Sequence, residues 1–276
     1  MKQIFLLLLT TIIMSISVFG FSGFGSIGAR SGAMGRASVS LTDFWSIQNN
    51  PAGMALQQHI GLGVAFENRF LMKELSLKSA ALVVPIQFGV LGLSYNQFGY
   101  NLYNENKVGL AYARSFGSLL RIGLQLDYLA SRFAEGYEGK DNVTFELGVQ
   151  SSITDKMTIG AYVFNPIKVR FSDVTDEKIS VVMRFGFSYL FTEKLIGIAE
   201  IEKQFDFNPD LRLGIEYKMN ETFYARTGVA LNPGLFTFGA GMQFSNLRFD
   251  LAASMHQVLG SSMQASLIYQ FGQSER

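Results

Sequence analysis

From Ile60 to the end of the chain, apolar and polar residues alternate with a period of two. One run places Leu120, Ile122 and Leu124 at every second position, with Arg121 between the first two. Because successive side chains of a strand point to opposite faces, this alternation predicts β-strands with one apolar and one polar face. We count about fourteen such segments, near residues 60–70, 74–86, 88–98, 106–116, 119–132, 142–151, 156–164, 178–190, 194–204, 210–219, 222–231, 234–244, 246–256 and 262–272.

The lengths of these segments and of their links indicate a membrane barrel. Each segment has roughly ten residues, the length that a tilted strand needs to cross a bilayer. Short turns such as 87–88 and 245–246 follow even-numbered segments, and mostly longer links such as 165–177 follow odd-numbered ones. Outer-membrane barrels have short periplasmic turns and longer external loops. The sequence thus predicts an all-β, transmembrane antiparallel barrel of about 14 strands over residues 59–276, in the bacterial outer membrane, with both termini periplasmic.

The direction of the two strand faces separates a membrane barrel from a soluble sandwich. A barrel turns its large apolar side chains toward lipid, whereas a sandwich buries them. Here the polar face is rich in glycines such as Gly123, Gly148 and Gly214, and Tyr and Phe recur near segment ends. Both features favour an exterior in contact with lipid and a lumen with room for an internal plug. A soluble periplasmic β-sandwich binding module stays open as an alternative.

The first 58 residues follow a different pattern. Lys2 precedes an apolar run over residues 4–18, which predicts a signal peptide over residues 1–20, with an uncleaved anchor as the alternative. Residues 21–58 are rich in Gly and Ser and lack sustained alternation. We expect turns and short helices there, with Thr42 or Asp43 capping a helix over residues 44–47.

Composition excludes several classes of function. The chain has 23 Lys and Arg against 22 Asp and Glu, so a basic nucleic-acid footprint is not expected. It has no cysteine and two distant histidines, His59 and His256, which argues against a metal centre and against an enzyme with a His base. A G-x-G-x-x-G match over residues 23–28 lacks the βαβ context of a dinucleotide site. We therefore expect no cofactor, no metal and no catalytic residue.

Opposite charges recur on the polar face of the C-terminal segments. An unpaired charge in a narrow, poorly hydrated space costs several kcal/mol. We therefore expect lumen ion pairs, across strands and with the N-terminal segment; a polar translocation path is the functional alternative. The residues concerned are Arg212, Glu216, Arg226, Arg248 and Asp250.

A motif at the end of the N-terminal segment carries a family resemblance. It consists of Asn49, Asn50, Pro51, Ala52 and Gly53, and a G-A-R-x-x-x-M-G-x-A stretch precedes it over residues 28–37. This order, followed directly by the barrel, resembles FadL-like barrels and, among them, the PorV/PorQ group of Bacteroidetes-like bacteria. The resemblance implies a fourteen-strand barrel plugged by residues 21–58, in which the motif shapes the plug.

Three roles follow in order of expectation, and the resemblance implies the first two of them. The first is an accessory or structural role in type IX protein secretion or surface attachment, with secretion components or secreted cargo as partners beside outer-membrane lipid. The second is a FadL-like channel for hydrophobic small molecules. The third is the soluble module named above. The chain departs from both barrel types in its modest external loops, which leave little room for a large ligand platform.

Overall fold

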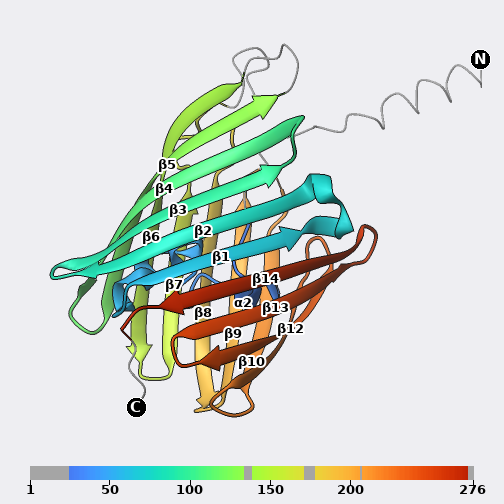
Figure 1. The fold of residues 1–276 in the computed structure, drawn as a ribbon. Coiled ribbons are helices and arrows are strands. Elements are labelled where there is room, and N and C mark those ends of the chain that lie inside the picture. Colours follow the sequence, from blue (N-terminus) through green and yellow to red (C-terminus); the bar gives the residue numbers. More distant parts are fainter. Residues whose placement is uncertain (1–24, 134–138, 171–177, 206, 273–276) are drawn as a thin grey trace, which may run out of the picture.

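The computed structural model describes residues 25–133, 139–170, 178–205 and 207–272, so the expected signal peptide lies outside the described residues. Within these ranges, fourteen antiparallel strands close into a barrel (Figure 1). Every strand pairs with its neighbours in sequence, and β1 pairs with β14 to close the wall. The predicted all-β antiparallel barrel and its strand number are confirmed.

The strand bounds follow the predicted segments with few differences. They are β1 Gly61–Asn68, β2 Ser76–Ile86, β3 Gly89–Gly99, β4 Tyr103–Phe116, β5 Leu120–Phe133, β6 Lys140–Thr154, β7 Met157–Phe164, β8 Val182–Thr192, β9 Leu195–Gln204, β10 Asp210–Lys218, β11 Phe223–Ala230, β12 Leu235–Phe244, β13 Leu247–His256 and β14 Gly260–Gln270. Two short 3₁₀ helices, η2 Arg69–Leu71 and η3 Lys73–Leu75, link β1 to β2.

Two strand starts differ from the predicted ones by more than two residues, and each has an identifiable reason. β4 begins at Tyr103 rather than near 106, because Tyr103 pairs with Phe133 and the polar residues between hide the alternation. β8 begins at Val182 rather than at 178. Residues before it turn inward, where Ile179 is buried and its backbone N–H donates to the Val169 carbonyl oxygen instead of to a neighbouring strand.

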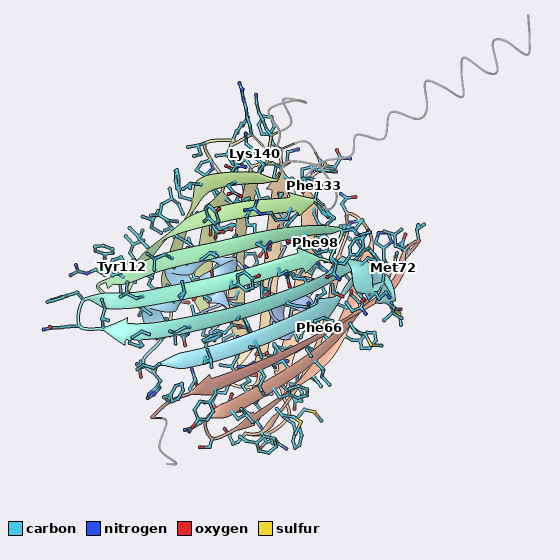
Figure 2. All side chains as sticks on the ribbon, turned by 45° about the horizontal axis from the view of Figure 1, so that its top comes forward. Phe66, Met72, Phe98, Tyr112, Phe133 and Lys140 are labelled. Carbon is cyan, nitrogen blue, oxygen red and sulfur yellow. The ribbon has the colours of Figure 1, made fainter. Side chains whose placement is uncertain are left out.

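The two faces of the wall are reversed relative to a soluble protein. On β5, Leu126 is 53% exposed on the outside, while its neighbour Asp127 is 1% exposed on the inside. Figure 2 shows side chains covering the outer surface, with Tyr112 toward one end of the wall and Phe133 and Lys140 at the other. We call these the short-turn end and the long-loop end, after the links found there. The outward apolar face is the arrangement that a lipid surround favours.

Residues 25–58, which we call the inner segment, lie within the barrel (Figure 1, where α2 is seen behind β13 and β14). The segment contains α2 Ala29–Gly32, α3 Ser46–Asn49 and the 3₁₀ helix η1 Pro51–Leu56. The helix expected over residues 44–47 begins instead at Ser46. In the described residues, no helix is long and apolar enough to span a bilayer.

The late start of α3 has a packing reason. Trp45 is 1% exposed and its ring lies so close to Gly28 that a Cβ there would come within 2.4 Å of it. Phe44 meets Trp45 edge to face, with ring centroids 5.2 Å apart. Because both rings are fixed by these contacts, Thr42 and Asp43 do not cap the helix, and Trp45 takes the N-cap position without a side-chain cap bond.

Glycines on the inward face make room for the inner segment. Gly123 and Gly148 are direct partners on β5 and β6. A Cβ at Gly123 would lie 2.3 Å from the carbonyl carbon of Pro51, and one at Gly148 would lie 1.9 Å from Oδ1 of Asn50. Real Cβ contacts are longer than this, so only glycine fits at these two positions without a shift of the inner segment. The lumen is therefore packed rather than open at this depth.

Candidate functional site

The inner segment is held at its centre by two buried asparagines. Asn49 bonds the backbone of Ile27 twice: its Oδ1 accepts from the N–H at 2.8 Å and its Nδ2 donates to the carbonyl at 2.9 Å. Asn50 donates from Nδ2 to the Val39 carbonyl oxygen at 2.7 Å, and at longer range to the carbonyls of Val149 and Ala161 on the wall. The two side chains thus join distant parts of the inner segment to each other and to β6 and β7.

The rest of the motif continues this packing. Oδ1 of Asn50 accepts from the N–H of Ala52 at 3.2 Å, while Pro51 occupies the first turn of η1, where its missing N–H is not needed. Pro51, Ala52 and Gly53 are all buried. A Cβ at Gly53 would lie 2.6 Å from Oγ of Ser46, so the small residue lets η1 approach α3 closely. Through these contacts the motif fixes the first half of the inner segment in position against β5 and β6.

Four of the five charged residues singled out from the sequence form one cluster. Nε of Arg226 lies 2.5 Å from Glu216, and its Nη1 lies 2.8 Å from Asp250. Nε of Arg248 contacts the other oxygen of Asp250 at 3.0 Å. Glu216 and Arg226 are direct cross-strand partners on β10 and β11, which explains their contact.

Arg30 of α2 completes this cluster from the inner segment. It contacts Glu216 through two nitrogens, at 2.6 and 2.9 Å, and Asp43 at 3.1 Å. Burial by itself would lower the pKa of the Arg30 guanidinium, but attraction to Glu216 and Asp43 raises that pKa above its ordinary value. Arg30 therefore remains charged and ties α2 to the wall.

Arg212, the fifth residue, belongs to a separate cluster nearer the long-loop end. It contacts Asp210 at 2.7 Å, Glu202 at 2.5 Å and Glu200 at 3.3 Å. Arg184 on β8 also contacts Glu202, at 2.6 Å. Glu202 was not identified from the sequence, although the alternation on β9 places it two positions after Glu200 and hence on the same face.

Glu200 binds the inner segment as well as the arginines. One of its carboxylate oxygens accepts from the backbone N–H groups of Ser38 and Val39, both at 2.7 Å. A third buried cluster of charged side chains joins Lys107 to Glu146 at 2.6 Å and to Asp127 at 3.9 Å. Lys107 was not identified from the sequence. Lys107 follows the inward alternation of β4, so its face, though not its partner, was readable from the sequence.

Apolar side chains fill the opposite side of the lumen. Both faces of β2 are apolar over much of their length, and Leu77 and Val83 point inward among buried residues. They belong to a cluster that joins the wall to the inner segment. Its members include Phe44, Trp45, Ile47, Met54, Leu77, Val83, Val90, Phe98, Leu129, Tyr162, Phe164 and Ile179.

A polar cavity of about 260 Å³ lies at the short-turn end. Arg30, Asp43, Trp45 and Arg248 are among the residues that line it. In the described part of the chain, no three His, Asp or Glu side chains gather as metal ligands. Nδ1 of His256 accepts from the N–H groups of Val258 and Leu259 and so caps a hairpin turn.

Comparison with known proteins bears on the fold. No family model matches the chain, and no curated protein matches it. Among solved structures, the Pseudomonas putida toluene transporter TodX aligns over 92% of this chain and 99% of its own, with 14% identity and a TM-score of 0.66. A FadL homologue of Pseudomonas aeruginosa aligns over 88% and 98%, with 14% identity and a TM-score of 0.64.

The chain has the FadL/TodX-like barrel fold. A more distant likeness, to the outer membrane protein Omp33 of Acinetobacter baumannii, has a TM-score of 0.51 at 7% identity over 79% of this chain and 100% of that one. At such identities the likeness concerns the fold alone. The FadL-like part of the resemblance drawn from the motifs is thus confirmed at the level of fold, whereas nothing in these comparisons tests the PorV/PorQ group.

Proposed function

We propose that this chain is an outer-membrane barrel that passes small hydrophobic molecules across its lumen. The observation that carries the proposal is the alignment of 92% of this chain with a toluene transporter. The apolar outer face supports a place in the bacterial outer membrane, with lipid around the wall. This favours the channel, our second expectation, over the secretion role.

The apolar side of the lumen supports the same function. Phe98, Leu129 and Phe164 lie toward the long-loop end, and Ile47 and Met54 of the inner segment continue the apolar cluster inward. An apolar molecule gains free energy by leaving water for such a surface, roughly in proportion to the area it buries. Because the lumen is packed, passage requires the inner segment to shift.

In the proposed orientation the short-turn end faces the periplasm. The last described residues lie there, where the N–H of Phe271 donates to the Ile60 carbonyl oxygen. Gly25, in contrast, lies beside Arg36 and Arg69, and Arg69 is in the link between β1 and β2 at the long-loop end. That both termini are periplasmic stays a prediction, since the residues before Gly25 are not described.

A disulfide lock tests whether passage needs the inner segment to move. The chain has no cysteine, and the N–H of Ala29 lies 3.2 Å from Oγ of Ser266 on β14. We expect cells producing the barrel to take up labelled toluene faster than cells without it. Uptake by the double variant Ala29→Cys, Ser266→Cys should stop on oxidation and return on reduction.

Each single cysteine variant is the control, because it cannot form the lock and should transport under both conditions. Uptake by the unmodified barrel that does not exceed that of cells without it would remove the transport proposal. Uptake that persists in the oxidised double variant would show that molecules pass without a shift of the inner segment.

A second candidate is the accessory role in type IX secretion or surface attachment. One observation favours it. Hydrogen bonds of Asn50 fix the motif at residues 49–53 in place, as expected for a rigid barrel that holds a partner. Deletion of the gene should then reduce the amount of cargo on the cell surface. The oxidised double cysteine variant should restore that cargo, whereas it should not restore toluene uptake.

A further inference from the structure

The outer surface of β6–β9 carries an apolar groove of about 550 Å³. Its floor is Ala161, which lies between Val149 and Phe185 as their direct cross-strand partner. The larger neighbours rise on both sides because Ala161 has no side chain beyond Cβ. The groove is lined by Leu147, Val149, Ala161, Val163, Met183, Phe185, Ile201 and Lys203, and it is bordered by Tyr162 and Arg184, whose side chains are buried on the inward face.

A single cation marks the end of this groove. In the described parts of β7–β10, Lys203 is the one charged side chain among the outward positions, where the others are apolar or aromatic apart from small residues. It lies opposite Met183 near the long-loop end of β9. Its Nζ donates to the backbone carbonyl of Phe207. Lysine in such a place buries its stem and keeps its ammonium at the level of lipid headgroups.

Residues beside Lys203 have the character of a membrane interface. Nζ of Lys168 lies 3.7 Å from the centroid of the Phe205 ring. Phe205 is 57% exposed and Phe207 is 45% exposed. Aromatic rings and lysines gather where hydrocarbon meets headgroups. The groove thus runs from two cations at the headgroup level down along an apolar wall.

We propose that this groove binds one membrane lipid with an anionic, phosphate-bearing headgroup, in the leaflet at the long-loop end. Lys203 contacts the phosphate, Lys168 on the Phe205 ring supplies a second positive charge at this end of the wall, and one acyl chain lies over Ala161. The positive charge of the two lysines favours an anionic headgroup. The apolar lining favours a lipid with an acyl chain over a soluble anion. The inference rests on the membrane placement proposed above, and it does not depend on what passes through the lumen.

Native mass spectrometry of the full barrel tests the proposal, with lipid A and its dephosphorylated form as probes. The unmodified barrel should retain one lipid A and less of the dephosphorylated form. Lys203→Gln should lower the affinity for lipid A about fivefold, the factor that one lysine contributes near an anionic lipid surface. The same change should leave binding of the dephosphorylated form unaltered. Ala161→Leu, which fills the groove, should remove both.

Matched controls keep the test specific. Lys194→Gln changes a lysine in the turn between β8 and β9, at the opposite end, and Ala225→Leu enlarges an outward alanine on β11 outside the groove. Both should bind lipid as the unmodified barrel does. Equal loss in Lys203→Gln and Lys194→Gln, or equal retention of the two probes, would overturn the proposal. So would an Ala161→Leu variant that dissociates a dimer while lipid binding persists, since a second copy would then be the occupant.

Toluene uptake separates this inference from the proposed function. Lys203→Gln should transport normally, because Lys203 faces away from the lumen. Normal toluene uptake with equal binding of lipid A and its dephosphorylated form would contradict the lipid site alone. A barrel that retains lipid A without transporting toluene would contradict the transport proposal alone.

Discussion

Asn50 donates a hydrogen bond from its side-chain Nδ2 to the carbonyl oxygen of Val39, and 2.7 Å separate the two atoms. The bond joins two passes of the inner segment in the middle of the lumen, next to β6 and β7. Oδ1 of the same side chain accepts from Ala52 and so starts η1. An amide carries its donor and its acceptor on separate atoms, which suits the two bonds that asparagine makes here.

Replacement of Asn50 by aspartate should destabilise the barrel more than replacement by alanine. Alanine removes one of the two donors to the Val39 carbonyl, which keeps its bond from Nε2 of Gln150, at a cost of about 0.5–1.5 kcal/mol. Aspartate places a buried carboxylate against the carbonyls of Val39, Val149 and Ala161, which adds the cost of an unpaired charge. Urea unfolding from detergent micelles should give that order. The reverse order would mean that the donor role of Nδ2 is not what stabilises this site.

Gly148→Ala should also destabilise the barrel, because the new Cβ would lie 1.9 Å from Oδ1 of Asn50. Overpacking of this kind costs about 1–3 kcal/mol. The matched control is Gly197→Ala on the outer face, where the new Cβ meets the tip of the Phe191 ring and that ring can move aside. The midpoints of urea unfolding should separate the two variants; equal midpoints would argue that the inner segment does not press on the wall at Gly148.

The alternation along the chain predicted the strands and their two faces, the link lengths indicated the barrel, and the glycines of the polar face favoured an apolar exterior. Leu126 and Asp127 illustrate why: a strand exposes neighbouring side chains to opposite sides, and a chain with this many strands and few charges can bury only one side. The same reasoning placed Glu216 and Arg226 in the lumen. Their contact follows from the register of β10 and β11, and the short turn between those strands fixes that register.

The parts that the sequence did not reveal depend on depth and on packing. Arg212 and Glu216 share a face of one strand, yet they join different clusters, because alternation defines the face of a residue and not its partner across the lumen. The start of α3 was also missed. It depends on the contact between Trp45 and Gly28, which are distant in sequence, and local capping signals at Thr42 and Asp43 carry no information about it.

Glu216→Gln should be among the most destabilising single substitutions in the lumen. Glu216 contacts Arg30 and Arg226 directly and lies 3.9 Å from Arg248. Its neutralisation leaves these three arginines facing two carboxylates, Asp43 and Asp250, with one buried positive charge in excess. Loss of one partner from a buried ion pair costs about 3–5 kcal/mol. The control is Glu221→Gln, which removes the exposed contact with Lys218 and should leave the unfolding midpoint unchanged. Similar midpoints for both variants would indicate that water screens the lumen cluster.

Trp45 offers a direct reading of whether the inner segment moves, because it is the single tryptophan of the chain. It is 1% exposed and lies between Phe44 and Gly28. Its fluorescence should therefore be blue-shifted and resistant to quenching by iodide in the resting barrel. Toluene should increase quenching in the unmodified chain and in the reduced Ala29→Cys, Ser266→Cys variant, but not after oxidation. Quenching by iodide without toluene would show that the packed lumen opens spontaneously, and the transport proposal would then need no movement triggered by its substrate.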